Sequence, residues 1–266
     1  MGYQDITFDV KEGIAIITLN RPEKRNALSE GMVEDIVVAL DQVQRDYAIK
    51  VLIITGAGKA FCAGGDIKRM DERGGMFGGN LAELRDNYRF GIQRIPQALS
   101  KLDKPTIASV NGAAMGAGCD LTCMCDIRIA SERAKFSSSF VNVGLVPGDG
   151  GTFFLPRVVG LSKACEMIFT GEVIDAKEAG RIGLVSRVVS STELAKVTGG
   201  LASKIAKGPS VAIRMAKLAI YKGLESDLSA NLDLLAHLQA IAQNTEDHME
   251  GVKAFLDKRP PIFQGK

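Results

Sequence analysis

Two continuous apolar runs, each followed by a glycine-rich turn, constrain the fold of this chain more than any other feature. Residues 51–55 (VLIIT) and residues 106–110 (TIASV) lack the polar–apolar alternation of a strand with one face in water. Such runs are typical of strands buried on both faces of a parallel sheet. Residues 127–130 are a further short strand candidate. Helical segments between these strands predict an α/β protein with a β–α sheet layer.

The N-terminal residues predict a hairpin and then a helix. Residues 6–10 and 14–19 are apolar-rich and flank a short Lys-Glu-Gly turn, which is the pattern of two paired strands. Ser29 stands where a helix cap is expected, and apolar side chains follow it at helical spacing to about Tyr47.

The pattern changes at about residue 190, where strand signals fade and helical periodicity runs almost to the end. Pro209 is expected to begin one helix. Another helix carries an apolar stripe formed by Leu228, Leu232, Leu235, Leu238 and Ile241. We therefore predict an α/β core over residues 1–190 and a helical segment over residues 191–266. The stripe needs a surface to bury it, and either the core of the same chain or another subunit would serve.

Composition and charge restrict the partners. Hydrophobic residues make up 46% and charged residues 24%, which fits a globular protein with an ordinary core. Lys and Arg total 33 against 31 Asp and Glu, so a formal net charge of +2 gives no argument for nucleic acid or an anionic membrane. No apolar run approaches the roughly 20 residues of a membrane span. Five cysteines, an odd number, and no sign of export favour reduced thiols in a cytoplasm.

The clustered cysteines are expected to be small buried side chains and not metal ligands. Cys119, Cys123 and Cys125 lie close together, but both histidines, His237 and His248, are far away in the sequence. We therefore predict no metal site.

Both glycine-rich turns lead from a strand toward a helical segment. Residues 60–66 read AFCAGGD and residues 111–120 read NGAAMGAGCD. Junctions of this kind present free backbone N–H groups and a partial positive charge, which suit a phosphate or a developing oxyanion. Many such turns are only turns, and neither matches the spacing of a dinucleotide or P-loop motif. Residues 73–80, with four glycines, predict a mobile loop, either a substrate lid carrying Met76 and Phe77 or a flexible surface loop.

Several motifs, in order along almost the whole chain, resemble the enoyl-CoA hydratase/isomerase (crotonase) superfamily. They are NRP at residues 20–22, NAL at 26–28, FCAGGDI at 61–67, VNG at 110–112, GAGCDL at 116–121, CDI at 125–127, GLVP at 144–147 and GGT at 150–152. The resemblance implies the crotonase (ClpP-like) fold, a spiral of repeated strand–strand–helix units with a helical C-terminal segment that forms trimers.

The resemblance also implies a substrate, an acyl-CoA thioester, with no separate cofactor. The N–H groups of Gly65 and Ala117 would form an oxyanion hole for the thioester carbonyl. Phe255 and Lys258 match a position that approaches the adenine, and Lys24, Arg25 and Lys68 are candidate phosphate partners. The residues expected along the CoA and acyl chain are Arg25, Ala27, Ala63, Asp66, Ile67, Lys68, Phe140, Phe255 and Lys258. The implied assembly is a homotrimer or a dimer of trimers.

The acid/base residues depart from the hydratase pattern. Hydratases of the family use two glutamates 20 residues apart, but this chain has Asp120 at the first position and Phe140 at the second. Phenylalanine cannot transfer a proton, so hydration by two glutamates is in doubt. Asp149 is the other candidate acid, although a carboxylate near a helix start also has a structural explanation. Asp126 is interpreted as a hydrogen-bond anchor.

Three classes of function remain open. The first class moves or hydrates a C=C bond in an enoyl-CoA. Isomerisation needs one well-placed base, and Asp149, with or without Asp120, would serve, whereas hydration would need both aspartates to reach a water. The second class is thioester hydrolysis, decarboxylation or ring-carbon chemistry, which would use the same oxyanion hole with other side chains around the acyl group. A non-catalytic acyl-CoA binder or an RNA-associated relative is the third class, and the near-neutral charge and the two aspartates argue against it. We favour the isomerase-type reaction.

Overall fold

The computed structural model describes residues 2–266, and its larger sheet confirms the strands that the apolar runs predict. Six strands lie in the order β1-β2-β3-β5-β7-β10. Their bounds are β1 Ile6–Lys11, β2 Ile14–Leu19, β3 Val51–Gly56, β5 Thr106–Val110, β7 Ile127–Ser131 and β10 Arg187–Val189. β1 and β2 form the predicted antiparallel hairpin, and the strands from β2 onward run parallel. Every residue of β5 is buried, as a strand covered on both faces requires.

A smaller, four-stranded sheet consists of strands only two or three residues long, in the order β4-β6-β8-β9. Their bounds are β4 Ala60–Cys62, β6 Ala113–Met115, β8 Lys135–Ser137 and β9 Ile174–Asp175. The chain passes from the larger to the smaller sheet at β3–β4, β5–β6 and β7–β8, and helices follow the first two of these crossings. This repeat is the predicted strand–strand–helix spiral.

Helices cover the larger sheet on both faces. The side chain of Ser29 accepts a hydrogen bond from the N–H of Met32 (3.0 Å), so α1 (Glu30–Arg45) begins where the sequence predicts. α1 packs on one face, and Leu194 and Ala202 of α9 (Leu194–Ala206) pack on side chains of β3, β5 and β7 on the other. The remaining helices of the α/β part are α2 Ile67–Asp71, α3 Leu81–Asn87, α4 Arg94–Lys101, α5 Ala117–Cys123, α6 Gly151–Val159, α7 Leu161–Thr170 and α8 Ala176–Arg181.

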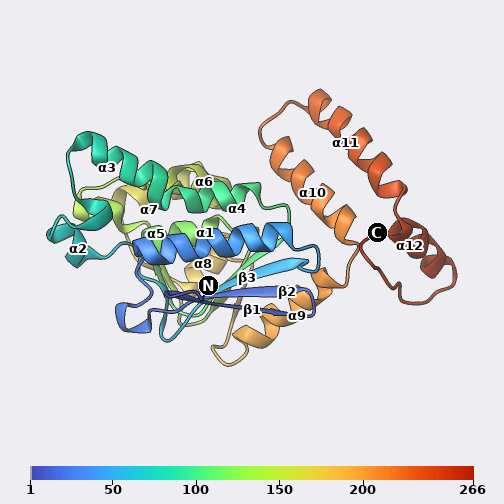
Figure 1. Ribbon diagram of the computed structural model, residues 1–266, viewed down its shortest axis with the longest axis horizontal. Helices are drawn as coiled ribbons and strands as arrows, with labels where there is room; N and C mark the ends of the chain where they lie inside the picture. Colours follow the sequence, from blue (N-terminus) through green and yellow to red (C-terminus); the bar gives the residue numbers. More distant parts are fainter. Residues whose placement is uncertain (1) are drawn as a thin grey trace.

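The last three helices project from this body, whereas α9 belongs to it (Figure 1). They are α10 Ser210–Gly223, α11 Leu228–Gln243 and α12 Glu246–Leu256. Of the predicted apolar stripe on α11, only Leu238 is buried, while Leu228 stays 73% exposed. The core of the same chain therefore does not cover the stripe. No helix within residues 2–266 combines the length and the apolar content needed to cross a bilayer.

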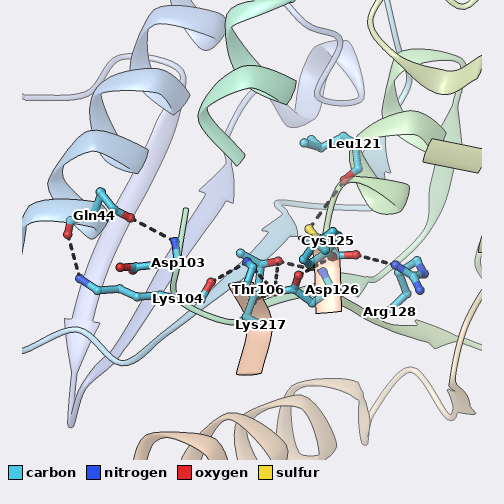
Figure 2. A network of polar contacts seen from close by, with 10 residues as sticks. Gln44, Asp103, Lys104, Thr106, Leu121, Cys125, Asp126, Arg128 and Lys217 are labelled. Atoms are coloured by element: carbon cyan, nitrogen blue, oxygen red, sulfur yellow. Dashed lines mark hydrogen bonds and ion pairs between the residues drawn. The ribbon is translucent and has the colours of Figure 1, made fainter. Parts of the chain in front are cut away.

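A polar network fixes the base of this helical arm to the α/β body (Figure 2). Asp126 accepts hydrogen bonds from the N–H of Thr106 (2.7 Å), from Nζ of Lys217 (2.8 Å) and from the hydroxyl of Tyr221 (2.6 Å). Lys217 and Tyr221 lie on α10, and Asp126 closely follows α5 in the chain. The structure thus confirms Asp126 as a hydrogen-bond anchor, and the clustered Cys119, Cys123 and Cys125 as buried side chains. Cys62 is buried as well.

Candidate active site

The two glycine-rich turns lie against each other because β4 and β6 are neighbours in the smaller sheet. Gly64 and Gly116 both have positive φ, +85° and +50°, which glycine adopts without strain. A Cβ atom on Gly64 would lie 2.6 Å from the carbonyl oxygen of Met115, and one on Gly118 would lie 2.1 Å from that of Cys62. Only glycine permits this approach of the two backbones.

The turns bring the N–H groups of Gly65 and Ala117 to one place. Ala117 is the first residue of α5, so its N–H has no partner within the helix. In the part of the chain that the structure describes, neither N–H makes a backbone hydrogen bond. Two unpaired donors beside a helix start can stabilise negative charge on an oxygen atom placed between them.

Gly65 and Ala117 both line a partly open, apolar cavity. The cavity also contains Phe140 and Asp149, so the structure brings together four residues that the sequence singled out. The complete wall consists of Leu28, Gly65, Met70, Met76, Phe77, Asn87, Tyr88, Ile92, Ala117, Phe140, Leu145 and Asp149. An apolar cavity with a few polar groups is the usual form of a small-molecule site.

Asp120 and Asp149 form a buried pair of carboxyl groups. Asp149 lines the cavity, whereas Asp120 is fully buried behind it and does not. Asp120 lies under the start of α6, where a Cβ atom on Gly151 would be 2.2 Å from Oδ2 of Asp120. Within residues 2–266 the Asp120 oxygens have no side-chain partner other than Asp149. Asp149 is therefore the member of the pair that a ligand can reach.

Burial and the hydrogen bond between Asp120 and Asp149 determine which of the two carboxyl groups holds a proton. Burial, with the neighbouring Asp149 charge and hydrogen bond, raises the pKa of Asp120 well above its usual range. Burial also raises the pKa of Asp149, but the hydrogen bond with Asp120 acts in the opposite direction. Asp120 is thus the more basic member and holds the shared proton, while Asp149 is the member that ionises first.

A polar groove continues from the cavity, with Leu28, Met76 and Phe77 in the walls of both. Basic side chains that line the groove are Arg21, Lys24, Lys68 and Arg69. Acidic side chains also line it, and Arg21 pairs with Asp5 at 3.6 Å. Lys24 and Lys68 are exposed. Arg69 is exposed as well, so an anion at this groove would meet these three cations.

Other residues predicted along the CoA surround the groove or support it. The side chain of Asp66 accepts hydrogen bonds from the N–H groups of Lys68 (3.1 Å) and Arg69 (3.4 Å), so it caps α2. Ile67 begins α2 and is exposed. The N–H of Ala63 donates a hydrogen bond to the carbonyl of Arg25 (3.0 Å). Ala27, two residues after Arg25, is buried. These contacts hold residues 25–28 beside the turn that carries Gly65.

The predicted loop at residues 73–80 contains one short helical turn, η2 (Gly75–Phe77), and supplies part of the cavity wall. A ring atom of Phe77 lies 3.3 Å, and Cε of Met70 2.5 Å, from the position of a Cβ atom on Gly65. Phe77 of the loop and Met70 of α2 therefore both lie close to Gly65. This contact agrees with the lid interpretation, and its mobility stays a prediction.

The structure does not bring Phe255 and Lys258 to the cavity within one chain. Phe255 lies on α12 and is 83% exposed, and Lys258 follows that helix. α12 and α2 stand at opposite ends of the long axis of the molecule (Figure 1). Their expected role at the adenine therefore requires a second copy of the chain and stays a prediction.

Several residues of the cavity wall were missed from the sequence. Asn87 ends α3, and Tyr88 and Ile92 lie in the helical segment η3 (Tyr88–Ile92) that follows it. Leu145 and Met70 add apolar surface. The backbone is non-helical at Gly91, so two helical segments meet at a kink within η3. The sequence gives no sign of this kink, which is visible only in the structure.

Two sheets joined by repeated strand–strand–helix units, with paired backbone donors over an apolar cavity, define a protein of the crotonase fold. The model of the enoyl-CoA hydratase/isomerase family matches residues 9–266, and the chain belongs to this family.

Relatives with this fold are similar along their whole length. A crotonyl-CoA hydratase of Syntrophomonas wolfei is 38% identical over 267 residues, covering 100% of both chains. A short-chain-enoyl-CoA hydratase of Clostridium acetobutylicum is 39% identical and covers 94% of both. The crystal structure of an enoyl-CoA hydratase from Bacillus anthracis has a TM-score of 0.92 at 36% identity, over 99% of this chain and 100% of that one. The chain is therefore an acyl-CoA enzyme of the hydratase/isomerase type.

Proposed function

We propose that this enzyme moves a C=C bond along an enoyl-CoA, with Asp149 as the acid/base. One observation carries the proposal. Asp149 lies in the same cavity as Gly65 and Ala117, while the position of the second hydratase acid is occupied by Phe140 in the wall of that cavity. The site thus offers a substrate one reachable carboxylate. A single base that removes a proton and returns it elsewhere suffices for a 1,3-proton shift.

The reaction proceeds in two proton transfers. The Asp149 carboxylate removes a proton from C2 of a 3-enoyl-CoA, and the electrons form a dienolate whose oxygen accepts hydrogen bonds from the N–H groups of Gly65 and Ala117. The protonated Asp149 then returns the proton to C4, which gives the 2-enoyl-CoA. Asp120 supports the cycle from behind, because its hydrogen bond favours the ionised form of Asp149.

The CoA part of the substrate is proposed to lie in the polar groove. Ala63, Asp66, Ile67 and Lys68 would follow the pantetheine, and Lys24, Arg25 and Lys68 would meet the phosphates as exposed cations. Phe255 and Lys258 of a second copy would reach the adenine end in a trimer or a dimer of trimers. The exposed apolar side chains of α10–α12 support such an assembly, because one chain leaves them uncovered. CoA enters as part of the substrate, so no further cofactor is proposed.

Hydration is the second candidate, because the most similar relatives reported above are named hydratases. Adding water needs one group to activate the water and another to protonate the substrate carbon. Asp120 would have to be the second group, yet it is fully buried behind Asp149. This geometry favours isomerisation.

We expect the wild-type enzyme to convert a 3-enoyl-CoA to the 2-enoyl-CoA at least about 10²-fold faster than it hydrates crotonyl-CoA, since loss of one general acid/base group typically costs that much. Initial rates with 2-enoyl-, 3-enoyl- and dienoyl-CoA substrates measure the ratio. Hydration of crotonyl-CoA at a rate equal to or above the isomerisation rate would reject the isomerase assignment in favour of hydration.

A further inference from the structure

Besides Asp149, the wall of the acyl cavity contains the phenol side chain of Tyr88. Only three polar side chains line the cavity: Asn87, Tyr88 and Asp149. Nδ2 of Asn87 donates to the carbonyl of Gly78 (3.2 Å) and is therefore occupied. Within residues 2–266 the Tyr88 hydroxyl makes no hydrogen bond, although the side chain is partly buried and lines the cavity. The hydroxyl is therefore a free hydrogen-bond donor at the cavity.

The helical segment η3 and the loop of Asp149 hold the ring of Tyr88 in place. Tyr88 is the first residue of η3, and Gln93, just after η3, donates from Nε2 to the carbonyl of Gly148 (2.8 Å). A Cβ atom on Gly148 would lie 2.9 Å from Cε1 of Tyr88, so only glycine lets the ring lie on this loop. Cε1 neighbours the carbon that bears the hydroxyl. The hydroxyl is therefore fixed beside the peptide that leads into Asp149.

The rest of the wall limits what the hydroxyl can bind. Apart from the three polar side chains and the backbone at Gly65 and Ala117, the wall is apolar, and no Lys or Arg lines it. Asp149 is the member of the acid pair that ionises first. A carboxylate on the acyl chain would meet this negative charge with no cation to offset it. A neutral oxygen that accepts a hydrogen bond would meet a free donor.

We propose that Tyr88 is a specificity-determining residue, whose hydroxyl donates a hydrogen bond to a neutral oxygen on the acyl chain. The substrate class is then an acyl-CoA with a keto or hydroxyl group beyond C4, because Asp149 must reach C2 and C4 and Tyr88 lies next to it. The position of this oxygen, beyond C4, rests on the proposed function, in which Asp149 acts at C2 and C4. The preference for binding such an acyl chain does not depend on any reaction.

The test compares the dissociation constants of three unreactive ligands, hexanoyl-CoA, 5-oxohexanoyl-CoA and glutaryl-CoA, by calorimetry. The wild type should bind 5-oxohexanoyl-CoA about tenfold more tightly than hexanoyl-CoA, as one neutral hydrogen bond allows. It should bind glutaryl-CoA more weakly than either. Tyr88→Phe should abolish the preference for the oxo ligand, so that it binds 5-oxohexanoyl-CoA no more tightly than hexanoyl-CoA.

Tyr47→Phe is the matched control, because Tyr47 is exposed and lies outside the cavity wall; it should keep the preference. Equal binding of hexanoyl- and 5-oxohexanoyl-CoA by the wild type would overturn the proposal, as would a preference that survives in Tyr88→Phe. Because these ligands do not react, a failure of the isomerase assignment would appear in the rate measurements and not here.

Discussion

Asp149→Asn is expected to reduce kcat for 3-enoyl-CoA isomerisation by about 10²-fold or more. Asparagine keeps the size of the side chain but cannot accept the C2 proton, and loss of a general base typically has this effect. Asp149 is the acid that faces the cavity, and Asp120 behind it is fully buried, so the pair offers no other reachable base. Initial rates at saturating substrate measure the loss.

Asp120→Asn is the matched control for this prediction. The amide still fits beneath Gly151 and still offers a hydrogen-bond donor to Asp149, so the loss should be only several-fold. Thermal protection by CoA should survive in both variants, because the acids lie at the acyl end of the site. A larger loss in Asp120→Asn than in Asp149→Asn would transfer the principal acid/base role to Asp120.

The pH profile follows from the same pair. The base must be ionised, and burial raises the pKa of Asp149 above the ordinary range of an aspartate. Activity should therefore rise with pH through a pKa above that range, and this limb should be absent from the residual activity of Asp149→Asn.

Ala117→Pro is expected to reduce kcat by about 10²- to 10³-fold, the usual consequence of removing one oxyanion donor. Proline removes the N–H itself, and Ala117 is the first residue of α5, a position where a helix accepts proline. Gly116 precedes it and is the residue type least restricted by a following proline. The fold should therefore survive, and binding of CoA should change little.

Ala117→Gly is the control for that variant, because it also changes the side chain but keeps the donor. It should retain most of the wild-type kcat. Full activity in Ala117→Pro, with thermal unfolding like that of the wild type, would exclude this N–H from the oxyanion hole.

The sequence predicted those parts of the fold whose signal is local. Residues 51–55 and 106–110 had to be buried strands because no charged residue interrupts them, and Ser29 had to cap a helix because the apolar spacing begins after it. The strands of the smaller sheet could not be predicted from the residues, because β4, β6 and β8 are only three residues long and show no alternation of polar and apolar side chains. Only the family resemblance implied the crossings between the sheets.

The residues of the site also fall into two groups, those that sequence motifs predict and those that only the structure reveals. Gly65 and Ala117 belong to motifs, Asp149 lies between two of them, and the parallel pairing of β4 with β6 brings the two glycine turns together. Tyr88 lies in no motif. Its place in the cavity depends on η3 and on the missing Cβ of Gly148, which the sequence does not reveal. Phe255 belongs to a matching position, but the partner surface it needs is not part of its own chain. Contacts across long sequence separations or between chains leave no periodic signal.

The most direct test of Asp149 as the group that moves protons at an enolate is deuterium incorporation from D₂O into a 3-enoyl-CoA, followed by NMR. The wild type should introduce deuterium at C2 and C4 of the acyl chain during turnover, because the proton that Asp149 takes from C2 exchanges with D₂O before the dienolate is reprotonated at C4 or at C2. Asp149→Asn should lose this exchange by about the same factor as kcat, while still binding CoA. Exchange that continues at the wild-type rate in Asp149→Asn would contradict the account.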